Sequence, residues 1–238
     1  MLLSELKGEA LIAPVQVLVD LSQRMTVEKL RTKTAAGSAS NSPQITLTAS
    51  RVQLPYDPSA VLLLEILTSI VARSEDSILD LWPIAFEFLS RLLASASSFS
   101  SLFNERVVAS LLRLVTVVIK HDELRDSTFL ALDTLRSLAP PVLSSVAEPL
   151  MAGLSKLFNE NADRIESTTE WNLIFALFSA TLQQEEAAKI SFELMRQLAA
   201  GKKDDKAKLG PNNYAPFLHV LVSFANVNAA PPNSSNAA

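Results

Sequence analysis

The 238-residue chain repeats one arrangement over most of its length, in which two apolar helical stripes are joined by a polar segment. The pairs of stripes begin near residues 57, 99, 141 and 184. Their spacing of roughly 42 residues lies within the period of two-helix repeats. A single helical pair cannot bury its apolar face alone, so it must stack on its neighbours. The spacing therefore favours a stack of helical pairs over other folds.

The composition also indicates helices. The chain has only 5 glycines, and 48% of its residues are hydrophobic but only 6% aromatic, so Leu, Val, Ile and Ala must supply the core. Few stretches alternate between apolar and polar residues in the way that strands do. We therefore predict an all-α fold, specifically a HEAT/armadillo-like right-handed helical solenoid of about four helical pairs rather than a globular bundle.

The apolar periodicity predicts where the helices lie. The third helix is expected to be the most buried of the set, with a narrow polar line along one side. Thr68 is expected on the polar side of the first helix, and Pro149 is expected to bend the fifth. The expected helices cover about 57–73, 76–96, 99–120, 123–138, 141–159, 167–182, 184–200 and 214–227. The polar line of the third comprises Arg106, Ser110, Arg113, Thr116 and Lys120.

Several helix ends carry recognisable signals. In "YDPSAV", the carboxylate of Asp57 can cap the free amides of a first turn, and Pro58 suits the first helical position because its missing N–H has no partner there. Ser167 and Glu170 have the spacing of a capping box. Gly201 is placed to end the seventh helix.

The chain divides into four predicted segments. The first is expected to contain short helices broken at Pro14 and near Arg24, and the second is rich in small, polar and β-branched residues typical of linkers. The predicted segments are 1–31, the end of a preceding region; 32–53, a flexible linker; 54–227, a HEAT-like helical-repeat domain; and 228–238, a disordered tail.

No set of residues has the spacing of a catalytic or metal site. The chain lacks a Gly-rich phosphate loop, a G-x-S-x-G motif and an H-E-x-x-H motif, and the absence of cysteine excludes disulfides and cysteine-bound zinc. The two histidines are far apart. We expect His121 to lie at the C-terminal end of a helix, where a positive charge is favourable. We expect His219 to be half-buried and hydrogen-bonded.

The remaining polar and aromatic candidates have plainer interpretations. Trp82 and Trp171 lie on apolar stripes and are expected to pack in the core, while Arg91 and Arg113 are expected on solvated faces. Three acidic pairs are expected to be solvated, namely Glu75 with Asp76, Glu185 with Glu186, and Asp204 with Asp205. Because no base, nucleophile or metal ligands converge, we expect no enzyme activity, no cofactor, and no catalytic, cofactor-binding or metal site. The sequence leaves the interaction surface unknown.

An interaction module is the function class that remains. The net charge of −4 with both signs mixed argues against a nucleic-acid partner. The N-terminus lacks the basic leader of a signal peptide, and the longest apolar run is shorter than the roughly 20 residues of a membrane span, so a soluble protein is expected. Residues 24–33 form a weak candidate for membrane contact, but their thin apolar side favours an ordinary short helix.

Three stretches resemble a known family. They are "LPYDPSAVLLLEIL" from Leu54, "NERVVASLLRLV" from Asn104 and "EWNLIFALF" from Glu170. In this order, they resemble regions downstream of the catalytic domain in the large Golgi guanine-nucleotide exchange factors for Arf GTPases, most closely the brefeldin-A-resistance-factor branch. The resemblance covers about residues 54–200. Its most specific parts are the Pro-Tyr-Asp-Pro element at 55–58 and the acidic-Trp segment at 170–177.

The resemblance implies a function. It suggests a non-catalytic region of a large multidomain chain that aids Golgi membrane recruitment and control of exchange activity in vesicle transport. The implied partners are a small GTPase of the Arf or Rab type or a coat component, Golgi membrane lipid, and other domains of the same chain. The implied location is cytoplasmic, peripherally associated with Golgi membranes. The alternative is an unrelated HEAT/armadillo scaffold for protein–protein interaction.

Overall fold

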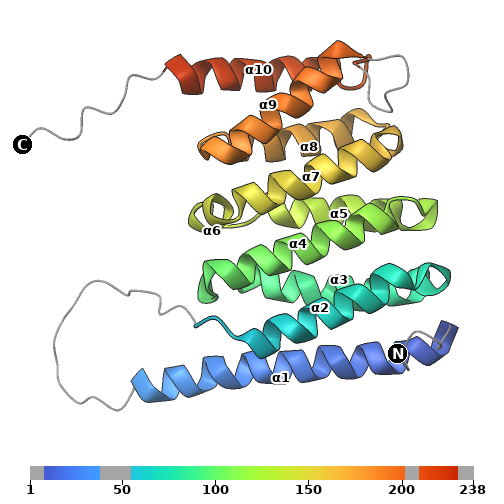
Figure 1. Ribbon diagram of the computed structural model, residues 1–238, viewed down its shortest axis with the longest axis vertical. Coiled ribbons are helices and arrows are strands. Elements are labelled where there is room, and N and C mark those ends of the chain that lie inside the picture. The colour runs from blue at the N-terminus through green and yellow to red at the C-terminus, as the bar shows by residue number, and fades with distance from the viewer. Residues whose placement is uncertain (1–7, 38–54, 202–208, 230–238) are drawn as a thin grey trace, which may run out of the picture. The chain divides into compact units, whose positions relative to one another are not determined.

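The computed structural model describes residues 8–37, 55–201 and 209–229, although not the side chains at 8–9, 26–37 and 227–229. Every regular element in these residues is a helix (Figure 1), which confirms the predicted all-α class. The chain forms two compact units, Met1–Thr134 and Leu135–Ala238. Each unit is described below by itself.

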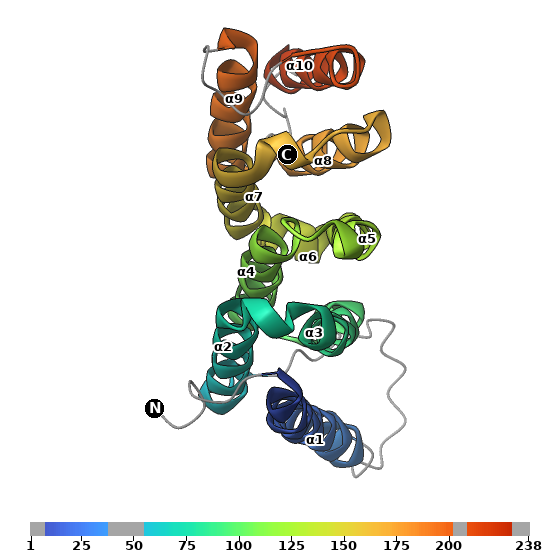
Figure 2. The same ribbon diagram turned by 90° about the vertical axis from the view of Figure 1, so that its right-hand side faces the viewer.

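Unit 1 contains the first four α-helices of the chain and most of the fifth. Helix α2 packs against α3 and α4, α3 also packs against α4, and α1 packs against α2 and α3 (Figure 2). The α-helices are α1 (Ile12–Gly37), α2 (Pro58–Arg73), α3 (Ile78–Ala94), α4 (Ser101–Val118) and α5 (Arg125–Arg136), whose last two residues belong to unit 2. The 3₁₀ turns are η2 (Gly8–Leu11), η3 (Glu75–Ser77), η4 (Ala96–Ser98) and η5 (Asp122–Leu124).

Unit 2 stacks its helices in two layers. Helix α7 packs against α9 in one layer, and α8 packs against α10 in the other (Figure 2). The elements are α6 (Pro140–Ser145), α7 (Ala147–Asn161), η6 (Ala162–Arg164), α8 (Thr168–Thr181), α9 (Glu185–Ala200) and α10 (Tyr214–Ala229). Alternate helices therefore share a layer, which is the packing expected of stacked helical pairs.

The cores of both units consist mainly of aliphatic side chains from the predicted stripes. Helix α4 has eleven buried residues out of 18, more than any other helix with described burial, so the prediction for the third helix is confirmed. Trp82 and Trp171 are 1% and 4% exposed, as predicted. In unit 2, the rings of Phe158, Trp171 and Phe175 pack together, with the centroid of Trp171 5.5 Å from that of Phe158 and 5.6 Å from that of Phe175.

The predicted caps are confirmed. The Asp57 carboxylate accepts a hydrogen bond of 3.1 Å from the Ser59 amide, and Pro58 is the first residue of α2. The hydroxyl of Ser167 accepts from the Glu170 amide, and the Glu170 carboxylate in turn accepts from the Ser167 amide at 2.9 Å. Gly201 follows α9 with a φ of 51°, a left-handed conformation that glycine adopts without steric penalty.

Three predicted interruptions of helices are wrong, namely the breaks at Pro14 and near Arg24 and the bend at Pro149. Helix α1 is continuous from Ile12 to Gly37, so no break occurs near Arg24. Pro14 is its third residue, in the first turn, where an N–H has no acceptor in the helix. The predicted fifth helix is two helices separated at Val146, which has a φ of −107° and ψ of 8°. Pro149 lies in the first turn of α7 and is accommodated there for the same reason.

Three hydroxyl residues expected on polar faces are buried instead. Thr68, Ser110 and Thr116 are 0%, 3% and 5% exposed. Each threonine hydroxyl donates a hydrogen bond of 2.8 Å to the carbonyl four residues earlier in its own helix. A hydroxyl satisfied in this way can be buried at little cost, so its polarity does not mark a solvated face.

Much of the predicted linker and tail falls outside the described residues. Residues 32–37 belong to helix α1, whereas the rest of the predicted linker, 38–53, lies outside the described residues. The predicted tail begins within the last two residues of α10, and 230–238 is likewise outside. The boundary proposed near residue 54 remains a prediction.

Candidate interaction groove

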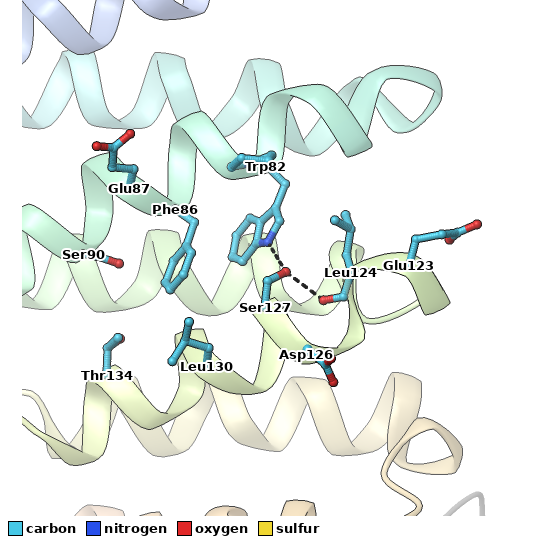
Figure 3. A pocket seen from close by; sticks show the side chains of 11 residues that line it. Trp82, Phe86, Glu87, Ser90, Glu123, Leu124, Asp126, Ser127, Leu130 and Thr134 are labelled. Atoms are coloured by element: carbon cyan, nitrogen blue, oxygen red, sulfur yellow. Dashed lines mark hydrogen bonds between the residues drawn. The ribbon is translucent and has the colours of Figure 1, made fainter.

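An open groove of about 650 Å³ lies between α3 and α5 in unit 1 (Figure 3). Most of its wall is apolar. The apolar side chains come from both helices and from the turn before α5, namely Trp82, Pro83, Phe86, Leu124 and Leu130. We call this feature the α3–α5 groove. Its size is within the range of about 300–1,000 Å³ typical of binding pockets.

Trp82 holds one end of the groove in place. Its indole lies parallel to the ring of Phe86, with centroids 5.2 Å apart and an interplanar angle of 8°. The two residues are four apart in α3, so they share one face of that helix. The indole Nε1 donates a hydrogen bond of 2.8 Å to Ser127 Oγ, and Ser127 Oγ donates one of 2.8 Å to the Leu124 carbonyl (Figure 3). These bonds tie α3 to the start of α5.

The groove leaves apolar surface uncovered. Leu130 is 56% exposed, and Phe86 is half-buried. Single exposed leucines are ordinary on protein surfaces, but an exposed leucine beside an aromatic wall and an open volume is typical of a binding site. Ser90 Oγ, farther along α3, is buried with no hydrogen-bond partner among the described residues.

The charges at the rim are acidic. Glu87, Glu123 and Asp126 line the groove, and no lysine, arginine or histidine is among its described lining residues. Glu87 forms an exposed ion pair with Arg91 one turn away, so its charge is partly compensated. Glu123 and Asp126 are both exposed. The groove therefore presents a negative rim around an apolar floor.

A second exposed apolar surface runs along α10 in unit 2. Tyr214, Leu218 and Val222 are 54%, 42% and 57% exposed. Their spacing of four residues places them on one side of the helix. The α3–α5 groove combines an exposed leucine and an aromatic wall with an open volume, so it is the better defined candidate.

The acidic residues predicted to be solvated show no convergent chemistry. Glu185 and Glu186 begin α9 and both pair with Lys189, at 2.9 and 2.7 Å. Hydrogen bonding to Lys189 lowers the pKa of Glu185, and the two carboxylates raise the pKa of Lys189. Glu75 and Asp76 are exposed, as predicted. Asp204 and Asp205 lie outside the described residues.

The other predicted polar residues also lie apart. His121 follows α4 and is half-buried, whereas His219 is exposed on α10, so the prediction of a half-buried His219 is wrong. Arg113 is partly exposed and reaches Glu65 at 4.0 Å. Within the described residues, no group of three or more histidine, cysteine or acidic side chains is arranged to hold a metal ion. No helix in that part of the chain is long and apolar enough to cross a membrane.

The groove was missed at the sequence level. Trp82 was assigned to the core, which is correct, but its role in lining a groove depends on α5, some 45 residues away. Leu130 offers a weak local signal, because it is an apolar residue that the structure leaves 56% exposed on α5. Such a residue is too common on surfaces to identify a site by itself.

Fold and groove together define an all-helical chain whose helices stack within each unit and whose surface offers an apolar groove. No protein-family model matches the chain, and no solved structure matches it. The chain is similar to the ARF guanine-nucleotide exchange factor GNOM of Arabidopsis thaliana, with 25% identity over 170 residues. The matched region covers 71% of this chain but only 11% of the length of GNOM. The similarity supports a distant relationship with an Arf exchange factor.

Proposed function

We propose that the chain is a non-catalytic regulatory and interaction region of a large Arf guanine-nucleotide exchange factor. The observation that carries this proposal is the 25% identity to GNOM over 170 residues. The region belongs downstream of the exchange domain, in the brefeldin-A-resistance-factor branch, as the "LPYDP" and "EWNLIF" stretches suggested. Its helical pairs form a right-handed HEAT-like solenoid, and the layered packing inside each unit supports this arrangement.

In this proposal, the region helps recruit the exchange factor to Golgi membranes from the cytoplasm and controls its exchange activity during vesicle transport. Its partner is a small GTPase of the Arf or Rab type, with coat components and Golgi lipid as further partners. The chain itself does not catalyse exchange. Support for the interaction role comes from the stacked helices, which provide extended surfaces for protein partners.

A binding assay tests the partner. The purified chain is immobilised and exposed to Arf and Rab GTPases loaded with GDP or with a non-hydrolysable GTP analogue. We expect at least one GTPase to be retained in a nucleotide-dependent manner. Retention of none, together with no flotation of the chain on liposomes of Golgi lipid composition, would favour the alternative of an unrelated helical scaffold.

An exchange assay tests the non-catalytic role. Release of a fluorescent GDP analogue from Arf is followed with and without the chain, using a catalytic exchange domain as positive control. We expect the rate with the chain alone to equal the intrinsic rate. Acceleration by the chain alone would contradict the proposal.

A further inference from the structure

We propose that the α3–α5 groove binds an amphipathic helix of a partner protein, one that presents bulky apolar side chains bordered by lysine or arginine. The groove would bind such a helix whether or not the chain regulates an exchange factor. The binding test below therefore succeeds or fails separately from the GTPase and exchange assays.

The dimensions of the groove match a helical ligand. Its wall on α3 extends from Trp82 to Ser90, which is about 12 Å at 1.5 Å per residue. A helix lying along this wall would place side chains at positions i and i+4 about 6 Å apart, and both would reach the apolar floor. Helices that dock in hydrophobic grooves use anchors with this spacing.

The floor is preformed for apolar anchors. Trp82 is fixed by its stacking on Phe86 and by its hydrogen bond to Ser127, so the groove needs little ordering when a ligand binds. Leu130 is uncovered on the opposite wall. An anchor seated between Phe86 and Leu130 would remove apolar surface from water on both sides, which is the main driving force for such docking.

The rim selects the charge of the ligand. Glu123 and Asp126 are exposed and have no ion-pair partner among the described residues. An acidic ligand would place like charges opposite them, whereas lysine or arginine beside the apolar anchors would complement them. The same negative rim would be repelled by an anionic membrane surface, because such surfaces attract basic protein segments. A basic amphipathic helix of a protein is therefore the occupant that both the floor and the rim favour.

Fluorescence anisotropy with the full chain tests the proposal. The probe is a labelled helical peptide of about 18 residues, five turns, with leucines at i, i+4 and i+7 and lysines beside them. Two control peptides carry glutamate in place of lysine, or the same residues in an order that disperses the leucines. We expect the lysine peptide to bind at least about tenfold more tightly than either control.

Matched variants locate the binding site. Leu130→Glu is expected to weaken binding of the lysine peptide at least about tenfold. The control is Leu62→Glu on α2, because Leu62 is similarly exposed, at 60%, but does not line the groove. Binding of the lysine peptide to this control variant is expected to be unchanged. Reversing the rim with Glu123→Lys and Asp126→Lys should shift the preference towards the glutamate peptide. The control reversal is Glu75→Lys with Asp76→Lys, which makes the same change of net charge just before α3. Circular dichroism confirms that each variant is folded.

Three outcomes would overturn the proposal. The first is failure of the lysine peptide to bind, and the second is equal weakening by Leu130→Glu and Leu62→Glu. The third is evidence that a second copy of the chain, or lipid, occupies the groove. Sedimentation that shows a dimer dispersed by Leu130→Glu would assign the groove to a second copy of the chain. Flotation on anionic vesicles that Leu130→Glu abolishes would assign it to lipid.

Discussion

The indole Nε1 of Trp82 and the hydroxyl of Ser127 are joined by a 2.8 Å hydrogen bond that links α3 to the first turn of α5. Trp82 is almost fully buried, so this hydroxyl is the partner that satisfies a donor withdrawn from water. The bond also sets the distance between the walls of the α3–α5 groove at one end.

Replacing the acceptor should destabilise unit 1. Ser127→Ala leaves the buried indole N–H without a partner and is expected to lower the free energy of unfolding by about 1–3 kcal/mol. In Trp82→Phe, the donor is absent, so adding Ser127→Ala to that background should have a smaller effect. Urea denaturation of the four proteins of this double-mutant cycle gives the coupling energy. A coupling near zero would show that the bond does not contribute.

The capping box of α8 should matter more than the simpler cap of α4. Ser167→Ala is expected to reduce stability by about 1 kcal/mol. Glu170→Ala should also be destabilising, because its carboxylate accepts from the amides of Glu166 and Ser167 at 2.8 and 2.9 Å. Ser100 accepts from the Phe103 amide at 3.4 Å without a reciprocal carboxylate, so Ser100→Ala is the matched comparison and should have the smaller effect. Thermal denaturation ranks the three variants, and a larger loss for Ser100→Ala would contradict this account.

Gly201 should be replaceable by asparagine at less cost than by alanine. A Cβ at this position would meet no atom within 4 Å, so the penalty comes from the backbone alone. Gly201 has a φ of 51°, in the left-handed region. Gly201→Ala is therefore expected to lower the free energy of unfolding by about 1 kcal/mol. Gly201→Asn should lower it less, because asparagine tolerates this region. Chemical denaturation measures both. Equal stability of the two variants would indicate that the end of α9 rearranges.

The ion pairs at the start of α9 should be detectable as a lowered pKa of Glu185. Hydrogen bonding and attraction to Lys189 lower the pKa of this carboxylate below its ordinary value of 4.5. A lowered pKa in the folded state contributes stability above the unfolded pKa, and this contribution is lost as the pH falls through the folded pKa. Lys189→Met should therefore raise the pKa of Glu185 towards 4.5, and an NMR titration of the carboxyl carbon measures this change.

Salt provides the control for that prediction. The three side chains are exposed, so 1 M NaCl should screen the attraction and shift the pKa of Glu185 in the same direction as the substitution. In Lys189→Met, added salt should have little further effect. A pKa that is unchanged by both the substitution and the salt would show that the pairs do not persist in solution.

Local signals predicted the ends of helices well. Asp57, Ser167 and Gly201 act through atoms within a few residues of themselves, and their identities alone specify the cap. The polarity of Thr68 and Thr116 was misleading, because their hydroxyls bond to their own helices and can be buried.

The groove lies beyond what periodicity can predict. It depends on how far apart α3 and α5 lie, and these two helices are not consecutive in the chain. The same limit applies to Pro149, which is accommodated because the chain breaks three residues earlier, at Val146, to begin a new helix. Neither the break nor the groove follows from the residue types alone.

The layered stacking within each unit has a consequence for how the protein opens. In both units, α-helices pack mainly against the next helix or the next but one. When packing is limited to such neighbours, stability is approximately a sum of local terms, and segments can unfold separately. Damage to the cap of α8 should accordingly speed amide hydrogen exchange in α8 and in the helices it touches, α6, α7, α9 and α10, and less so in α2.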